Sequence, residues 1–408
     1  MAHDPIAHLL LWLALVVAVA KLGSELAVRA RQPAVLGELL VGIVLGNLPF
    51  VGVHALAALP HDPALDLLAR LGLIVLLFQV GLASTIREML GVGLTSLGVA
   101  VVGVTGSTLF GFGAAFAVHP DVTRALFYGA AIAATSIAIT ARVLADLGCT
   151  ETTAARTILG AAVIDDVLGL MVLAIAQAVV GAAAAGQAVS AGAIVLVVGK
   201  AALFLVGALS IGALLVPHGL AAVSRLRGPG ALFAASLACC FFLAFAADRL
   251  GLSPIIGAFA AGLVLSEPAR HLFARAGLRS LDDMMQPIAE LFVPIFFVVV
   301  GTRTDLRAFG SPRTLALAAL LFAASLAGKA ACALVVERGV GRFAVVAGMW
   351  PRGEVMLVFA ALGAELTVHG APLVDRDGYA ALLLVVLLTT VVTPPALRVA
   401  FARVTKKT

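Results

Sequence analysis

Runs of about 20 or more mostly apolar residues recur along the whole chain, separated by short loops that carry most of its charged residues. A helix needs about this length to cross a bilayer core of about 30 Å. Because the hydrocarbon core offers no partner to an unpaired backbone group, such runs predict membrane-spanning helices rather than the short alternating strands of a barrel. With 62% hydrophobic and only 12% charged residues, the chain also lacks the charge of a water-soluble fold. The sequence therefore predicts an all-α polytopic membrane protein, of a size that suits a transporter or a channel.

Charged, proline and glycine residues mark the ends of the spans and predict about thirteen transmembrane helices. The predicted ranges are 6–27, 33–52, 65–83, 90–118, 123–147, 153–184, 190–216, 230–248, 253–267, 285–301, 313–337, 344–366 and 378–402. The first run has no basic segment before it, so we expect a retained helix rather than a cleaved signal peptide.

Lysine and arginine are unevenly divided between alternate loops. The richer side carries Arg29, Arg31, Arg87, Arg156, Arg225, Arg227, Arg270, Arg275, Arg279, Arg338, Arg342, Arg398, Arg403, Lys406 and Lys407. The poorer side carries Arg70, Arg124, Arg249, Arg303, Arg307, Arg313 and Arg376. The positive-inside rule assigns the richer side to the cytoplasm, which predicts an outside N-terminus and a cytoplasmic C-terminus.

Other features of the sequence exclude several kinds of partner. The net charge is +5, but the basic residues are scattered singly through short loops, so we expect no nucleic-acid site. The four cysteines lie in or beside apolar spans without the spacing of a disulfide framework or a zinc site. We therefore expect no cofactor, and the lipid bilayer as the surrounding partner.

Five ionisable residues lie deep within predicted spans, where each costs about 2.5–3.5 kcal/mol to insert. Asp165 and Asp166 are about twelve residues into the span 153–184, which is close to the middle of the membrane. Lys329 lies in the span 313–337, and Arg352 and Glu354 lie in the span 344–366. Such costly residues indicate a functional site rather than ordinary packing.

The two adjacent aspartates are poor candidates for a purely structural ion pair, because neighbours on a helix diverge by about 100° and like charges repel. Their carboxylates favour titration or the binding of a metal cation. Lys329 fits equally well as a salt-bridge partner of one aspartate or as a group with a transport role.

Two of the spans have polar centres. In the span 344–366, Pro351 and Gly353 predict a break in the helix, and Arg352 and Glu354 could support its freed backbone groups. The span 123–147 has Thr135 and Ser136 at its centre but no proline there. Composition alone therefore does not establish a break in that span.

Eight short motifs of this sequence follow the order found in one family. They are Pro33 to Glu38, Gly81, Ala134 to Ser136, the pair Asp165 and Asp166, Gly251 to Pro254, Pro294 to Phe297, Gly328 with Lys329, and Pro351 to Glu354. Over essentially its whole length the chain resembles the bacterial sodium/proton antiporters of the cation/proton antiporter superfamily, in their NapA-like branch. The aspartate pair followed by a lysine in mid-membrane is the specific part of this resemblance.

The resemblance implies a fold with inverted repeats, two crossed discontinuous helices, and a core domain beside a dimerisation domain. It divides the chain into residues 1–118 with scaffold helices 1–3 and the first core helix, 119–184 with core helices 5 and 6 and the ion site, 185–216 with the linker helix, 217–301 with scaffold helices 8–10, and 302–408 with core helices 11–13. It also implies a homodimer in the bacterial inner (cell) membrane.

The resemblance further implies that Asp166 binds the ion and that Asp165 pairs with Lys329. It puts Thr135 and Ser136 at the helix crossing, where they would join the ion-binding and proton-transfer residues. The implied activity is electrogenic exchange of Na⁺ or Li⁺ for H⁺ by alternating access, with no enzymatic reaction. Potassium/proton relatives often carry glutamine in place of the first aspartate, which this chain retains.

Three alternatives remain at this point. The strongest alternative is a potassium/proton or electroneutral exchanger, because hard monovalent cations all favour oxygen ligands. An intramembrane aspartyl protease needs facing aspartates on different helices, whereas these two are contiguous. A passive channel needs a continuous polar lining, whereas the charges form one compact cluster.

Overall fold

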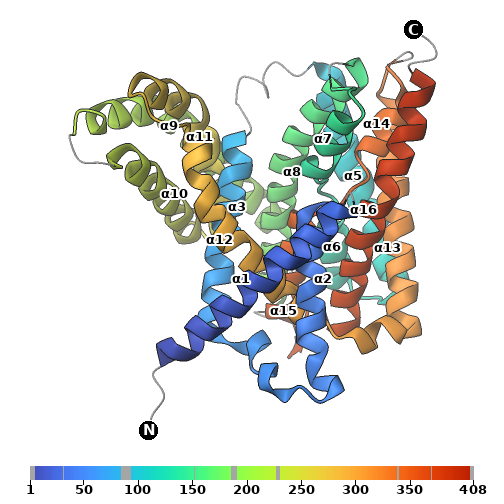
Figure 1. The fold of residues 1–408 in the computed structure, drawn as a ribbon. Coiled ribbons are helices and arrows are strands. Elements are labelled where there is room, and N and C mark those ends of the chain that lie inside the picture. The colour runs from blue at the N-terminus through green and yellow to red at the C-terminus, as the bar shows by residue number, and fades with distance from the viewer. Residues whose placement is uncertain are drawn as a thin grey trace. The chain divides into compact units, whose positions relative to one another are not determined.

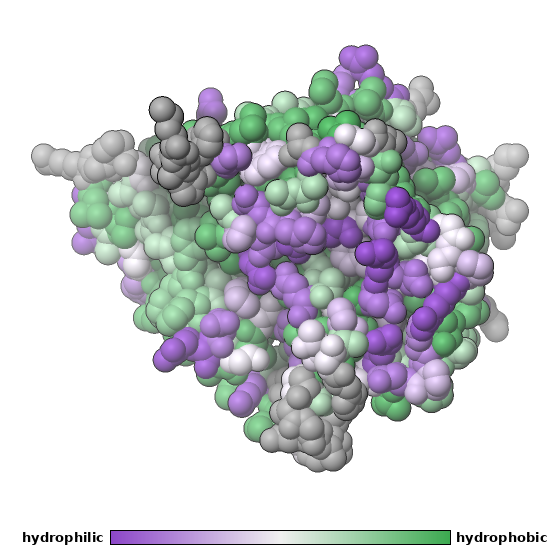
Figure 2. Space-filling model, turned by 90° about the horizontal axis from the view of Figure 1, so that it is seen from below, coloured by the Kyte–Doolittle hydropathy of each residue, from purple (hydrophilic) through white to green (hydrophobic). Residues whose placement is uncertain are grey.

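The computed structural model of the chain describes residues 5–30, 32–83, 93–150, 152–184, 191–226, 230–337, 340–368 and 370–404, which are almost entirely helical (Figure 1). Nine helices of this described part are long and apolar enough to cross a membrane, and Ala34–Phe50 forms a shorter apolar helix. Figure 2 shows hydrophilic residues gathered across the lower face and hydrophobic residues around much of its rim. The chain is a multi-pass membrane protein.

The chain forms two compact units, each built from an early and a late part of the sequence: residues 1–87 with 199–304, and residues 88–198 with 305–408. The helix α9 (Ala191–Val223) begins in the second unit and continues in the first.

The first unit consists of helices that pack through small residues. Its other elements are α1 (Pro5–Arg29), α2 (Ala34–Asn47), η1 (Leu48–Val51), η2 (His54–Leu56), η3 (Leu59–His61), α3 (Pro63–Ala83), α10 (Ala231–Arg249), α11 (Pro254–Arg275) and α12 (Leu281–Thr302). Where α3 crosses α11, a Cβ atom on Gly81 would collide with the carbonyl oxygen of Phe259, and one on Gly262 with that of Phe78. Glycine at these two positions lets the helices approach closely, as is typical of membrane helices.

The second unit contains two interrupted helices among continuous ones. Its elements are α5 (Leu94–Val118), α6 (Val122–Ala131), α7 (Ile137–Asp146), α8 (Thr153–Ala184), η4 (Leu306–Gly310), α13 (Pro312–Ala330), η5 (Ala331–Leu334), α14 (Arg342–Gly348), α15 (Glu354–Glu365), β1 (Thr367–Val368), β2 (Ala371–Pro372) and α16 (Arg376–Val404). The strands β1 and β2 form one short antiparallel hairpin. Buried side chains of α5, α8, α14 and α16 share one apolar core.

Most predicted helix boundaries hold within a few residues, but the span predicted at 285–301 begins earlier, as α12 from Leu281, and the α-helix in the span predicted at 313–337 ends at Ala330 and is followed by η5. The span predicted at 123–147 is two helices, α6 and α7, with non-helical residues 132–136 between them. The span predicted at 344–366 is likewise α14 and α15 around residues 349–353, as Pro351 indicated.

Two large errors in the predicted boundaries lie at prolines, where the predicted helix ends but the observed helix continues. The spans predicted to end at 216 and 267 continue as α9 and α11 through Pro217 and Pro268 to Val223 and Arg275. A proline removes one helical hydrogen bond, but neighbouring helices hold a membrane helix together across such a gap. Of the basic residues that set the predicted orientation, those outside the described part are Arg31, Arg87, Arg227, Arg338, Lys406 and Lys407.

Candidate functional site

The two helix breaks of the second unit bond to each other. The Ser136 N–H, in the break after α6, donates to the carbonyl oxygen of Pro351, in the break after α14, at 2.9 Å. The Thr135 hydroxyl donates to the Met349 carbonyl oxygen at 3.3 Å, and the Thr140 hydroxyl to that of Gly348 at 2.7 Å. Each break therefore satisfies polar backbone groups that the other has lost, as a buried backbone requires.

The fully buried Arg352 ties the break after α6 to its surroundings. Its Nη1 donates to the carbonyl oxygens of Ala134 at 2.9 Å and Ala133 at 3.3 Å. Its Nη2 donates to the Ser107 hydroxyl of α5 at 3.3 Å and to the Ser325 carbonyl oxygen of α13 at 3.2 Å. The guanidinium charge thus lies at the C-terminal end of α6, where the helix dipole is negative.

Asp165 on α8 is fully buried and uses both of its carboxylate oxygens. Oδ1 accepts a hydrogen bond from Lys329 Nζ of α13 at 2.6 Å, and Lys329 is also fully buried. Oδ2 accepts one from the Thr135 backbone N–H, just before α7, at 2.7 Å. The carboxylate of Asp165 therefore connects α8, α13 and the break after α6.

Asp166, the next residue on α8, has different surroundings because successive side chains on a helix point about 100° apart. Its side chain is 5% exposed, and its Oδ2 has no hydrogen-bond partner within the described part of the chain. A buried, ionised carboxylate oxygen without a partner is unstable, so such a group gains a proton or binds a cation.

Glu354 is the first residue of α15, and its Oε2 accepts a hydrogen bond from the Ser136 hydroxyl at 3.1 Å. A carboxylate at this position complements the positive end of the helix dipole. The structure thus brings all seven sequence-predicted site residues into one unit: Thr135, Ser136, Asp165, Asp166, Lys329, Arg352 and Glu354.

Charge and oxygen chemistry limit what this cluster can do. Its ionised carboxylates number three and its cationic side chains two, so the fully charged cluster carries one net negative charge. In the described part of the chain, no three His, Cys, Asp or Glu side chains converge as they would around a resident metal ion. The donor set suits a single proton or a monovalent cation at a carboxylate, with hydroxyl and carbonyl oxygens nearby.

Four further residues of the site escaped the sequence interpretation. The Arg352 guanidinium donates to the Ser107 hydroxyl and to the backbone carbonyl oxygen of Ser325, Thr389 accepts a hydrogen bond from the Arg352 backbone N–H at 3.1 Å, and Thr140 joins the two breaks. Isolated serine and threonine residues are common in membrane helices, where they also bond to their own backbone. For Ser107, Thr140 and Thr389 the only sequence signal is a hydroxyl in an otherwise apolar run, and Ser325 contributes a backbone atom that gives no such signal.

Comparison with known proteins places the chain among transporters. Residues 14–403 match the family model of the transmembrane sodium/hydrogen exchangers. The chain is 34% identical to the high-affinity Na⁺/H⁺ antiporter NhaS3 of a Synechocystis species, over 97% of this chain and 90% of that protein. It is 33% identical to the Na⁺/H⁺-K⁺ antiporter GerN of Bacillus cereus, over 95% of each chain.

A solved structure has a similar fold. The sodium/proton antiporter MjNhaP1 of Methanocaldococcus jannaschii superimposes with a TM-score of 0.73 at 15% sequence identity, over 97% of this chain and 98% of that one. At this identity the likeness concerns the fold alone.

Proposed function

Because the chain belongs to the family of transmembrane sodium/hydrogen exchangers, whose members are transporters and not enzymes, we propose that it exchanges Na⁺ for H⁺ across the membrane. Asp166 is the carboxylate that the two ions occupy in turn. The intramembrane protease considered from the sequence is excluded by this membership.

The observation that carries the proposal is the buried Oδ2 of Asp166, which has no hydrogen-bond partner among the residues that the structure describes. One Na⁺ or one proton at this carboxylate neutralises the single net negative charge of the cluster. Both ions therefore compete for one position, and a loaded site crosses the hydrocarbon barrier more readily than an empty, charged one. Competition for Asp166 then couples the movement of one ion to that of the other.

Alternating access follows from this coupling. In our proposal the core helices, 4–6 and 11–13 of the predicted spans, move against the scaffold helices 1–3 and 8–10 of each protomer in a homodimer. Asp165 and Lys329 lie beside the ion and respond to its charge, and Thr135 and Ser136 contribute polar atoms at the helix crossing. Cross-links that fix core helices 4–6 to scaffold helices 1–3 should stop turnover, and unchanged turnover would contradict the motion.

Potassium is the second candidate ion. The name of GerN, which is 33% identical to this chain, includes K⁺ as well as Na⁺. Oxygen ligands accept Na⁺, Li⁺ and K⁺, so the donor set by itself favours none of them strongly. Exchange of K⁺ for H⁺ at the same carboxylate is therefore the alternative to Na⁺ or Li⁺ exchange.

The test uses purified protein in proteoliposomes that contain a pH-sensitive dye. Na⁺, Li⁺ and K⁺ are added in turn. Na⁺ should dequench the dye, and the responses to the three ions together give the selectivity. Asp166→Asn should abolish the response at every ion concentration. A wild-type response from Asp166→Asn would remove this residue from the mechanism.

Asp121→Asn is the matched control, because Asp121 caps α6 by accepting a hydrogen bond from the Arg124 N–H. Asparagine caps helices as well as aspartate, so this variant removes a carboxylate from the same unit without opening the helix. It should exchange ions at the wild-type rate.

The proposed location is the cell membrane, with the N-terminus outside and the C-terminus in the cytoplasm. Single cysteines introduced at Ser224 and Ala371, in a chain whose native cysteines are replaced, should then react from opposite sides of the membrane. Labelling of both from one side would contradict the predicted topology. The mass of the protein–detergent complex by light scattering tests the homodimer.

A further inference from the structure

A further buried carboxyl group, that of Glu38 on α2, lies in the first unit and outside the ion site. Its side chain is only 5% exposed, and its Oε2 has no hydrogen-bond partner among the residues that the structure describes. The helix that carries it is a short apolar one, so the group lies in a membrane-embedded segment. An ionised oxygen without a partner is costly there. The proposed ion exchange does not account for this residue.

The direction of the Glu38 side chain follows from its neighbours on α2. Toward α1, a Cβ atom on Gly23 would lie 2.5 Å from Cγ2 of Val41. Toward α12, a Cβ atom on Gly42 would collide with the carbonyl oxygen of Val298. At 100° per residue, position 38 lies between position 41, which faces α1, and position 42, which faces α12. Glu38 therefore points into the junction of α1, α2 and α12.

Two charged side chains meet at the surface of this junction. Lys21 Nζ on α1 lies 3.7 Å from Oε2 of Glu290 on α12, and both side chains are more than half exposed. Gln286 Nε2 donates a hydrogen bond to the other oxygen, Oε1, of Glu290 at 3.1 Å. The positive charge of Lys21 also acts on Glu38. The junction thus combines one ammonium group with two carboxyl groups from different helices.

The charges of the junction do not balance when all its groups are ionised. Lys21 then neutralises only one of Glu38 and Glu290, so one negative charge remains within the membrane-spanning segments. The nearby charged residues of α1 do not compensate it, because Arg29 and Glu25 pair with each other at 2.7 Å. A single proton on Glu38 removes the excess charge.

From these contacts we infer that Glu38 is a second proton-binding site of the protein, and that its proton decides the partner of Lys21. While Glu38 is protonated, it is a neutral side chain packed among the three helices, and Lys21 pairs with Glu290. When the proton leaves, the Glu38 carboxylate attracts the Lys21 ammonium group away from Glu290. The flexible four-carbon stem of lysine permits this movement. The link between α1 and α12 therefore depends on pH.

Infrared difference spectroscopy on the purified full-length protein in proteoliposomes tests the site, because a protonated carboxyl group has a carbonyl band of its own. As the pH is raised from about 5 to about 9, the loss of a band shows where a carboxyl group releases its proton. The wild type should show one such band that Glu38→Gln lacks. Identical spectra for the two proteins would overturn the inference.

Two variants at exposed positions test the change of partner, and they do so even if Glu38→Gln folds poorly. Lys21→Gln removes the positive charge, so the Glu38 band should disappear at a higher pH than in the wild type. Glu290→Gln leaves Lys21 free for Glu38, so the band should disappear at a lower pH. We expect each shift to be about one pH unit, which is a tenfold change in proton affinity. If no band shifts in opposite directions in the two variants, the inference is wrong.

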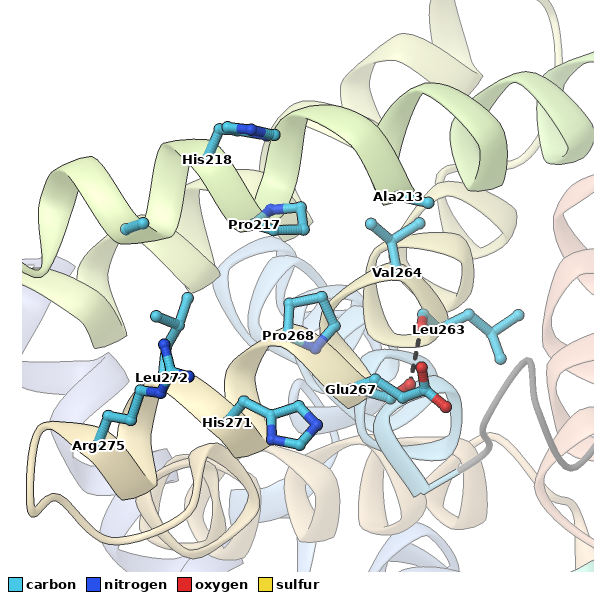
Figure 3. A pocket seen from close by; sticks show the side chains of 12 residues that line it. Ala213, Pro217, His218, Leu263, Val264, Glu267, Pro268, His271, Leu272 and Arg275 are labelled. Carbon is cyan, nitrogen blue, oxygen red and sulfur yellow. Dashed lines mark hydrogen bonds between the residues drawn. The ribbon is translucent and has the colours of Figure 1, made fainter.

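Glu267→Gln is the matched control. Glu267 is an exposed carboxylate of the same unit, but it lines a cavity of about 560 Å³ between α9 and α11 and not the junction (Figure 3). This variant should keep the wild-type band and midpoint. A similar shift in Glu267→Gln would mean that any lost charge has this effect, which would contradict the inference. Because the measurement needs no transport, its outcome is independent of the proposed ion exchange.

Discussion

The ammonium group of Lys329 lies 2.6 Å from Oδ1 of Asp165, and both side chains are fully buried. The pair joins α13 to α8, and Asp165 also holds the backbone N–H of Thr135 at the helix crossing. A buried pair of this kind contributes little net stability, but removal of one partner leaves an uncompensated charge that costs about 3–5 kcal/mol. The stability of the second unit therefore depends strongly on keeping both partners of this pair.

Lys329→Gln should destabilise the protein strongly, because it leaves Asp165 charged and unpaired in the membrane. The double variant Asp165→Asn/Lys329→Gln should recover much of the loss, since no isolated charge remains. Thermal unfolding in detergent measures both effects. Lys200→Gln is the control, because Lys200 is an exposed lysine on α9. Equal melting temperatures for the single and double variants would argue against the buried charge as the cause.

The rate of exchange should depend on membrane potential. If Lys329 releases its proton when Na⁺ enters and Asp165 loses its partner, more than one proton returns for each Na⁺. Lysine suits this role because its pKa changes readily on burial, whereas an arginine stays charged. We expect a voltage-dependent rate in vesicles clamped with potassium and valinomycin, and a weaker dependence for Lys329→Gln. If the rate of the wild type does not change with the imposed potential, Lys329 has only a structural role.

Gly328→Ala should destabilise the contact between α5 and α13. A Cβ atom at Gly328 would lie 2.5 Å from the Cα of Ser107, whose hydroxyl bonds to Arg352. The two helices would have to separate, at a cost of about 1–3 kcal/mol. Gly113→Ala is the control, because a Cβ there meets no atom within 4 Å. The melting temperature of Gly328→Ala should lie well below that of the control. Equal melting temperatures would mean that α5 and α13 can separate without cost, which would contradict the prediction.

Stability should fall in mild acid because of His119, which follows α5. Burial, and then the nearby Arg313 guanidinium, hold the pKa of this imidazole below its ordinary value of 6.5. Arg313 Nη2 lies 2.7 Å from His119 Nδ1, and Arg124, Asp375 and Asp377 also face the ring. The folded state therefore keeps His119 neutral while the unfolded state takes up a proton, so stability is retained above pH 6.5 and lost as the pH falls below it.

The expected slope is at most about 1.4 kcal/mol per pH unit for this one proton. Melting temperatures measured between pH 5 and 7.5 should fall less steeply toward acid for His119→Gln than for the wild type. Parallel profiles for the two proteins would contradict this assignment.

Much of the fold follows from local properties of the sequence. Hydropathy predicts the ends of α3 and α8 to within two residues, because a membrane span needs a continuous apolar run whatever its neighbours are. The same reasoning indicated the break at Pro351, since proline removes a backbone donor wherever it lies. It failed at Pro217 and Pro268, where each helix continues in spite of the proline.

The sequence by itself also indicated which charges are unusual, because Asp165, Asp166, Lys329 and Arg352 lie deep in apolar runs, where a charge is costly. Only the tertiary structure decided which groups these charges meet. The break at 132–136 contains no proline, and it is held open by Pro351 and Arg352, more than 200 residues away in the chain. Likewise, Asp165 is paired and Oδ2 of Asp166 has no partner among the described residues, because the side chains of two neighbours on one helix point in different directions. Contacts between distant segments leave no periodic signal in the sequence, so this part of the site emerges only when the helices pack.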